Sequence, residues 1–167
     1  FVNITIDDIR LQVPKDATIL EAAQKATIKI PTLCHLELHN RQTVNQVASC
    51  RICVVEVDGR RNLAPACSTK VANNMVIRTH SPRVLKSRRV LLQLLLSNHP
   101  KDCLNCYASG ACELQDLANQ FHTDKNRFEG ESSNFAIETS SAAITRDLNK
   151  CIRCRRCETA CNDMQTV

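Results

Sequence analysis

Residues 151–161 read CIRCRRCETAC, in which four cysteines follow the spacing CxxCxxCxxxC. This is the ligand string of a bacterial-type cubane iron–sulfur site, whose fourth cysteine binds the other cluster in two-cluster ferredoxins. We expect Cys151, Cys154 and Cys157 to hold one 4Fe-4S cluster and Cys161 to reach towards a second. No second run of this kind follows in the sequence. The site is therefore expected to be incomplete here, and the sequence reads as a piece of something longer.

The remaining seven cysteines fall into two further groups, so none of the eleven is left over. The first group is spaced Cys-x15-Cys-x2-Cys-x13-Cys and consists of Cys34, Cys50, Cys53 and Cys67. Plant-type 2Fe-2S ferredoxins use a Cys-x4-Cys-x2-Cys loop and a distant fourth cysteine, and only the first gap differs here. We expect one 2Fe-2S cluster. Zinc is the alternative, but structural zinc sites usually bring two close ligand pairs and this group brings one.

The second group combines one histidine with three cysteines, spaced His-x3-Cys-x2-Cys-x5-Cys. Its members are His99, Cys103, Cys106 and Cys112. Composition alone leaves two possibilities, because one histidine and three cysteines can also bind zinc tetrahedrally. If the group holds an iron–sulfur cluster, the neutral imidazole should raise the reduction potential, as histidine does in Rieske centres.

The composition favours metal-supported folding in a reducing compartment. Hydrophobic residues make up 43% of the 167 residues, but aromatics only 3%, and tryptophan is absent. Large side chains that anchor a core are therefore scarce, and bound metal clusters would help to hold short segments together. The odd number of cysteines and their tight spacing argue against a disulfide framework. We expect a cytoplasmic protein.

Neither a membrane nor a nucleic acid is an expected partner. The longest apolar stretch, Val90–Leu96, is interrupted by Gln93 and is too short to cross a bilayer. The formal charge of +5 reflects two basic groups, but the aromatic platforms that stack on bases are missing. Thiolate-bound clusters would also make the true balance less positive. The basic residues concerned are Arg83, Lys86, Arg88, Arg89, Arg153, Arg155 and Arg156.

Hydrophobic periodicity predicts strands and one helix in the first eighty residues. Alternation over residues 1–14 around Asp7-Asp8 predicts a hairpin, and Thr18 with Glu21 forms a capping box that opens a helix closed by Pro31. Further strands are expected at residues 52–57, 62–66 and 75–79, the first two joined through Asp58-Gly59. This order is that of a β-grasp fold, so the fold class is α+β.

Helices are predicted beyond this region. Ser81 as N-cap and Pro82 at the first helical position open a helix that runs to about Asn98. A shorter helix is expected over residues 113–121, and the polar residues 122–143 read as a linker. The expected buried face of the longer helix consists of Val84, Leu85, Leu91, Leu92 and Leu95.

The three ligand groups, in this order, carry a family resemblance. Together with residues 49–57, 98–103 and 147–151, they resemble the catalytic subunit of NAD(P)-linked, electron-bifurcating FeFe hydrogenases over essentially the full chain. Similar arrangements occur in the large iron–sulfur subunit of complex I, in NAD-dependent formate dehydrogenases and in diaphorase subunits of nickel–iron hydrogenases. Complex I-type and diaphorase-type chains usually lack the fourth cysteine of the last run, which favours the hydrogenase or formate dehydrogenase interpretation.

The resemblance implies a domain order and a role. It implies a β-grasp 2Fe-2S domain at 1–80, a His-ligated 4Fe-4S domain at 81–121, a linker at 122–143 and a partial 4Fe-4S ferredoxin domain at 144–167. The region would carry electrons between the active sites of an oxidoreductase and would have no catalytic residue of its own. Its partners would be a flavin- and NAD(P)-binding subunit, a small 2Fe-2S subunit and ferredoxin. The chain has only three glycines and no Gly-rich phosphate loop, so flavin and NAD(P) are assigned to those partners.

Overall fold

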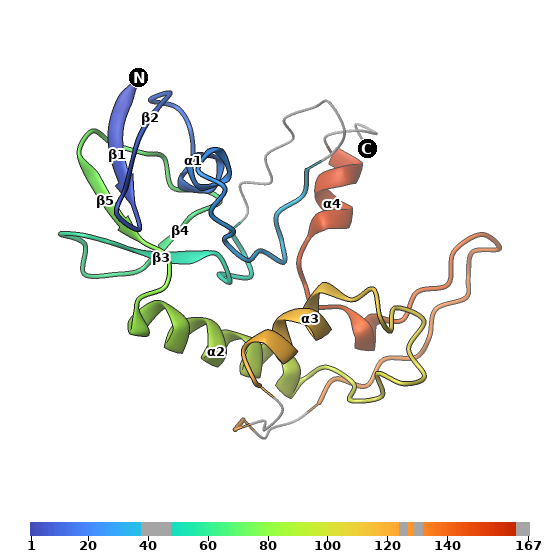
Figure 1. Cartoon of the computed structure of the whole chain (residues 1–167). Helices are drawn as coiled ribbons and strands as arrows, with labels where there is room; N and C mark the ends of the chain where they lie inside the picture. The colour runs from blue at the N-terminus through green and yellow to red at the C-terminus, as the bar shows by residue number, and fades with distance from the viewer. Residues whose placement is uncertain (38–47, 124–126, 129–131, 163–167) are drawn as a thin grey trace. The chain divides into compact units, whose positions relative to one another are not determined.

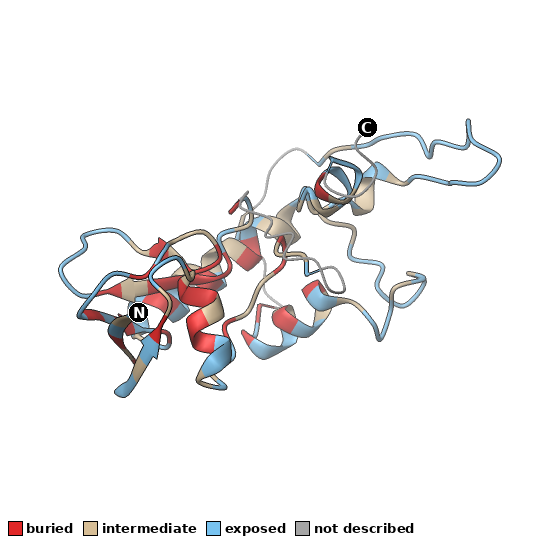
Figure 2. Ribbon diagram, turned by 90° about the horizontal axis from the view of Figure 1, so that it is seen from above, coloured by how far each residue is buried: buried red, intermediate tan, exposed pale blue. Residues whose placement is uncertain are grey.

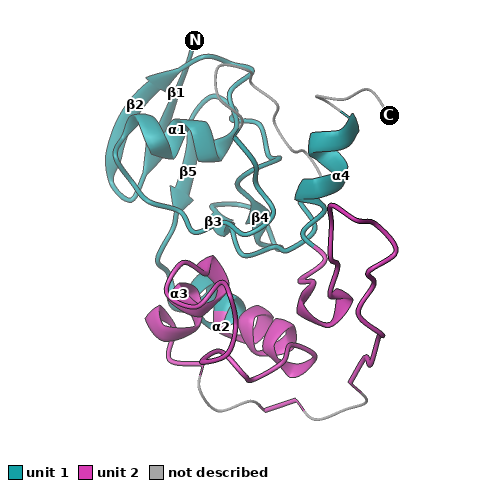
Figure 3. Cartoon of the chain, turned by 90° about the vertical axis from the view of Figure 1, so that its right-hand side faces the viewer, with its two compact units in different colours: residues 1–88, 154–167 teal, residues 89–153 magenta. Residues whose placement is uncertain are grey.

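A computed structural model describes residues 1–37, 48–123, 127–128 and 132–162. The chain divides into two compact units (Figure 3). Unit 1 comprises Phe1–Arg88 and Cys154–Val167, and unit 2 comprises Arg89–Arg153. The chain combines α and β structure, as the sequence predicts.

Unit 1 contains a five-stranded mixed sheet (Figure 1). The strand order is β2-β1-β5-β3-β4, in which β1 runs parallel to β5 and the other neighbours are antiparallel. The strands lie within the segments predicted from alternation, although β3 begins two residues later than expected. Their bounds are β1 Val2–Ile6, β2 Ile9–Val13, β3 Val54–Val57, β4 Ala64–Pro65 and β5 Met75–Arg78.

The β1–β2 turn also hydrogen-bonds to the residue that follows β5. Asp7 and Asp8 both have positive φ (44° and 70°), the conformation that a two-residue hairpin turn requires and that aspartate tolerates. The Asp7 carboxylate accepts a hydrogen bond from the backbone N–H of Thr79 at 2.7 Å and another from its hydroxyl. Thr79 is fully buried, so these bonds satisfy polar groups that water cannot reach.

Helix α1 (Ile19–Lys25) begins at the predicted capping box. The Thr18 hydroxyl accepts from the Glu21 N–H at 3.2 Å, and the Glu21 carboxylate accepts from the Thr18 N–H at 2.6 Å. The helix ends at the C-cap Ala26, several residues before Pro31. Thr27 follows with φ 59°, a left-handed turn that stops the helix earlier than the proline would.

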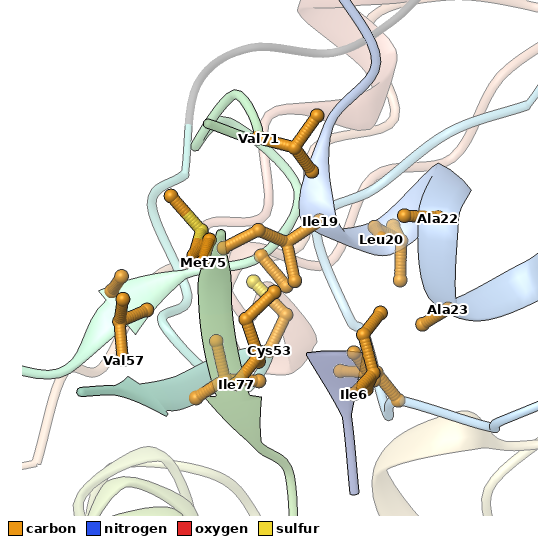
Figure 4. Packing of buried hydrophobic residues seen from close by; sticks show 14 of the residues in the cluster. Ile6, Ile19, Leu20, Ala22, Ala23, Cys53, Val57, Val71, Met75 and Ile77 are labelled. Carbon is orange, nitrogen blue, oxygen red and sulfur yellow. The ribbon is translucent and has the colours of Figure 1, made fainter. Parts of the chain in front are cut away.

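The core of unit 1 lies between α1 and the sheet (Figure 4). Ile19 and Leu20 of α1 pack with Ile6 and Ile77 of the sheet, and Cys53 belongs to the same cluster. Colouring by burial shows red segments gathered along α1 and the strands (Figure 2). A cluster ligand candidate is therefore part of the apolar core itself.

Helix α2 (Pro82–Ser97) starts as predicted, because the Ser81 hydroxyl accepts from the Val84 N–H at 3.3 Å. Its buried face differs from the expected one. Leu85 is 37% exposed, so its predicted burial is wrong, and Leu91 and Leu95 are only half-buried. Val84 and Leu92 are fully buried, as predicted, and Arg88, which was not predicted to be buried, lies between them at 1% exposure. The i, i+4, i+8 stripe faces inwards, and it includes a charged residue that hydrophobic patterning alone would leave outside.

The remaining elements are short. They are α3 (Glu113–Gln120), close to the expected bounds, the 3₁₀ turn η1 (Leu148–Lys150) and α4 (Arg156–Ala160). Within the expected linker, residues 124–126 and 129–131 lie outside the described part. Residues 136–143 are exposed, and one antiparallel bridge joins Glu138 to Arg146. In the described part of the chain, no helix has the length and apolar character needed to cross a membrane.

The capping box gives a stability prediction. Thr18→Ala removes one of the two reciprocal cap bonds and should lower the free energy of unfolding by about 1 kcal/mol. In a chain of this size that corresponds to a fall in the thermal midpoint of roughly 2–4 °C, measured by anaerobic circular dichroism. Thr18→Ser is the matched control, because it keeps the hydroxyl and should unfold near the wild-type midpoint. Equal midpoints for Thr18→Ala and wild type would contradict the role of the cap.

Candidate metal centres

The fold brings the four cysteines of the first group together inside unit 1. Cys34 follows α1, Cys50 and Cys53 flank the loop that leads into β3, and Cys67 follows β4. Cys34, Cys53 and Cys67 are each 1% exposed, and Cys50 is half-buried. Cys53 and Cys67 meet because β3 and β4 are neighbours in one sheet, and Cys34 reaches Cys50 and Cys67 from the segment after α1.

These thiols hydrogen-bond to one another. Bonds from Cys50 first, and then Cys67, lower the pKa of the Cys34 thiol, and the bond from Cys67 lowers the pKa of Cys53 to about 7. The same bonds with Cys34 raise the pKa of Cys50 and of Cys67. Two of the four sulfurs are therefore biased towards the thiolate form, which is the form that binds metal.

The loop between Cys50 and Cys53 is shaped to present both sulfurs. Arg51 has φ 59°, a left-handed conformation that turns the chain between the two cysteines. The Cys53 carbonyl accepts from the Ala66 N–H at 3.2 Å, which joins this loop to the segment carrying Cys67. The pairing fixes the loop with its thiols on the inside.

The donor chemistry of the first group fits a 2Fe-2S cluster. It supplies four neighbouring sulfurs, three of them shielded from water. The backbone bond from the Ala66 N–H to the Cys53 carbonyl holds two of the ligand loops together. A single zinc ion needs its ligands about 2.3 Å from one centre. Among the described residues, no three or more His, Cys, Asp or Glu side chains are placed to hold one metal ion. The choice between a 2Fe-2S cluster and zinc at this group therefore depends on the spacing of its cysteines.

The four residues of the second group line one small cavity in unit 2. This cavity, of about 30 Å³, is bounded by His99, Cys103, Cys106 and Cys112 among others. All but Cys106 also line an adjoining cavity of about 330 Å³ between α2, α3 and the intervening loop. Cys103 is exposed, and the other three are half-buried. The arrangement fits a cluster held by one imidazole and three thiolates at the end of α2.

The hydrogen bonding of His99 settles which ring nitrogen can bind metal. Its Nδ1 lies 3.0 Å from the Pro100 carbonyl oxygen. A carbonyl only accepts, so Nδ1 must carry the proton and Nε2 is left with a free lone pair. Metal-binding histidines commonly donate their other N–H to a carbonyl in this way, which fixes the ring orientation.

The third group is divided by the unit boundary: Cys151 belongs to unit 2, and Cys154, Cys157 and Cys161 belong to unit 1. Cys154 is half-buried and the other three are exposed. The structure brings these four into no common cavity among the described residues, so their assignment still depends on their spacing.

The backbone of the third loop nevertheless has the turns of a ligand loop. Arg153 (φ 54°) and Arg155 (φ 60°), one in each CxxC step, are left-handed, as Arg51 is in the first group. The Arg153 N–H lies 3.4 Å from the Cys151 sulfur. Cys151 also lines, with His99, a cavity of about 160 Å³ in unit 2, so the first cysteine of the third group is a neighbour of the second group there.

Arg88 is counted among the basic residues of the sequence without any role in a site, and the structure shows that it is buried. It is 1% exposed and donates from Nε to the Ile52 carbonyl at 3.1 Å and from Nη2 to the Val54 carbonyl at 2.9 Å. These carbonyls flank Cys53. The signal that could have found it is its four-residue spacing from Val84 and Leu92.

Comparison with known proteins accounts for most of the chain. Residues 1–82 match the 2Fe-2S iron-sulfur cluster binding domain, and residues 88–127 match the NADH-ubiquinone oxidoreductase-G iron-sulfur binding region. The two matches cover the segments that carry the first and second ligand groups.

Curated relatives and a solved structure extend the similarity to nearly the full chain. The NADP-reducing hydrogenase subunit HndD of Solidesulfovibrio fructosivorans is 54% identical over 99% of the chain and 28% of its own length. The G 2 subunit of the NADH-quinone oxidoreductase of Rhizobium meliloti is 38% identical over 98% of the chain and 19% of its own length. A structure of NAD⁺-reducing NiFe-hydrogenase in the H2-reduced state superposes with TM-score 0.85 and 30% identity, covering 96% of the chain and 65% of that structure's chain.

The chain thus spans less than a third of the length of these two curated relatives. The matches agree with the donor sets in requiring a 2Fe-2S cluster and 4Fe-4S clusters. Over nearly its full length the chain is therefore similar to the iron–sulfur regions of a G-type NADH-quinone oxidoreductase subunit and of an NADP-reducing hydrogenase subunit.

Proposed function

We propose that this chain is the electron relay of an NAD(P)-linked hydrogenase, passing single electrons between a flavin-bearing partner and a hydrogen-forming site. The observation that carries the proposal is the quartet of hydrogen-bonded cysteines in unit 1, three of them buried and Cys50 half-buried, followed along the chain by a second group that lines one cavity. When bound, the clusters supply one-electron redox chemistry, which divides the two-electron chemistry of a nicotinamide.

The geometry and the cysteine spacing together support the following proposed ligand sets. Cys34, Cys50, Cys53 and Cys67 hold the 2Fe-2S cluster on a β-grasp domain at 1–80, which the parallel β1–β5 pair and the α1 crossing support. His99, Cys103, Cys106 and Cys112 hold a 4Fe-4S cluster in a domain at 81–121. Cys151, Cys154, Cys157 and Cys161 begin a further 4Fe-4S module at 144–167, after the linker at 122–143.

The protein's own groups then perform three tasks. Burial of Cys34, Cys53 and Cys67 excludes water from the first centre. The Pro100 carbonyl orients the His99 ring, so that Nε2 is the ligand atom. The cavity lined by both His99 and Cys151 keeps a ligand of the third centre beside a ligand of the second, and one-electron exchange requires such proximity.

The 54% identity with an NADP-reducing hydrogenase subunit favours a hydrogenase. The electron-bifurcating FeFe type is our proposal from the sequence resemblance. Its partners are a subunit binding flavin and NAD(P), a small 2Fe-2S subunit and ferredoxin, in the cytoplasm. The second candidate is a complex I-type subunit, which the similarity to the G 2 subunit of an NADH-quinone oxidoreductase supports. The presence of an H-cluster in the complete protein would decide between them.

The two complete ligand groups can be tested against each other. Cys67→Ala should abolish the electron paramagnetic resonance (EPR) signal of the reduced 2Fe-2S cluster and leave the His-ligated cluster intact. Cys112→Ala should have the reverse effect, because each cluster depends only on its own ligands. The two variants serve as controls for each other. Loss of both signals in either variant, or of neither, would disprove the assignment.

The role of His99 as a ligand can be tested by replacing its neutral imidazole with a negatively charged thiolate. His99→Cys should leave the 4Fe-4S cluster assembled and lower its midpoint potential, because a thiolate brings negative charge that imidazole lacks. His99→Ala should make the cluster labile. The measurement is an EPR-monitored redox titration, with the 2Fe-2S potential as internal reference. An unchanged potential in His99→Cys would mean that His99 is not a ligand.

The relay role predicts a division of activity. The purified 167-residue chain should not reduce a viologen dye with NADH, because it has only three glycines and no phosphate-binding loop. Addition of the NADH-oxidising flavin subunit of its complex should reduce its clusters, followed by their visible absorbance. NADH-dependent viologen reduction by the chain alone would contradict the relay role.

A further inference from the structure

Arg88 is a buried cation without an acidic partner. Its side chain is 1% exposed, and within the described residues no carboxylate forms an ion pair with its guanidinium. Burial lowers the pKa of Arg88 to about 10, while the negative charges of Cys53 and Asp7 oppose that fall. The group therefore stays charged at neutral pH. A buried charge of this kind is costly unless something nearby compensates it.

The two hydrogen bonds of Arg88 complete the edge of β3. β3 pairs with β4 through Val54 and Val55, and with β5 only through Glu56 and Val57. The Cys53 carbonyl points towards β4, where it accepts from Ala66. Ile52 lies in the turn before β3 and Val54 is the first residue of β3, and β5 pairs with neither of them. Arg88 donates to the carbonyls of both residues at 3.1 and 2.9 Å and takes the place of the missing strand.

The guanidinium thus holds the backbone carbonyls of the two residues on either side of Cys53, one of the four cysteines of the first centre. A 2Fe-2S cluster held by four thiolates is anionic, and it gains one more negative charge on reduction. A fixed positive charge in a poorly solvated site stabilises the reduced form more than the oxidised form. In turn, the negative charge of the centre offsets the free-energy cost of burying the Arg88 charge.

We propose that Arg88 is the positioning and potential-setting residue of the 2Fe-2S centre: it braces the backbone on both sides of Cys53 and raises the midpoint potential through its buried charge. The inference rests on the proposed assignment of Cys34, Cys50, Cys53 and Cys67 as the ligands. It extends that assignment from the ligands to a residue of α2 that supports them. It also explains why a helix otherwise buried through Val84 and Leu92 carries an arginine between them.

The test is an EPR-monitored redox titration of the cluster-loaded protein with three variants. Arg88→Gln removes the charge and keeps one amide donor, Arg88→Lys keeps the charge and loses the forked geometry, and Lys86→Gln removes an exposed charge from the same helix as the matched control. Arg88→Gln should lower the reduced-to-oxidised ratio of the 2Fe-2S cluster about tenfold at a fixed potential, which is about 59 mV for one electron. Arg88→Lys and Lys86→Gln should titrate close to wild type. The 4Fe-4S potential should not move.

The outcomes separate this inference from the assignment on which it rests. A wild-type protein without a 2Fe-2S signal would defeat the proposed function itself. A wild-type signal whose potential is unchanged in Arg88→Gln, or shifted equally in Arg88→Lys, would overturn only the role of the charge. If Arg88→Gln loses the cluster and Arg88→Lys retains it at the wild-type potential, the requirement for a buried cation is upheld. Loss of the cluster in both would show that geometry, not charge, is what the site needs.

Discussion

The mutual burial of four thiols is the constraint on which unit 1 depends. Cys34, Cys53 and Cys67 are almost inaccessible and hydrogen-bond within the quartet that Cys50 completes. The core around them contains aliphatic side chains and no tryptophan, so large anchoring groups are few. A cluster bound to these sulfurs joins the loop after α1 to the loops next to β3 and β4, and does the structural work that aromatic residues do in other small domains.

Helix α2 links this constraint to the next part of the chain. Its buried stripe begins with Val84 and Arg88 against the sheet, and its carboxyl end leads into His99. One continuous helix therefore carries both a residue that braces the first centre and the approach to a ligand of the second.

Local signals explain which features the sequence could predict. The Asp7-Asp8 turn, the Thr18 capping box and the start of α2 at Pro82 each depend on neighbouring residues, and all three are confirmed. Cysteine spacing likewise predicted the first and second groups, and the structure brings the members of each together. The left-handed turn at Thr27 was not predicted, and the partners of Arg88 are carbonyls 36 and 34 residues away, which periodicity does not identify even where the spacing indicates burial. Arg88 in particular violates hydrophobic patterning because its partners are backbone carbonyls exposed by the shortness of β5.

The central claim is that these cysteine groups hold iron–sulfur clusters and not zinc. Metal and acid-labile sulfide analysis of the anaerobically purified chain tests it most directly, supported by the Mössbauer spectrum of ⁵⁷Fe-enriched protein. We expect iron and sulfide in nearly equal amounts, with both 2Fe-2S and 4Fe-4S components in the spectrum. Zinc as the dominant metal, in a colourless protein without labile sulfide, would contradict the account.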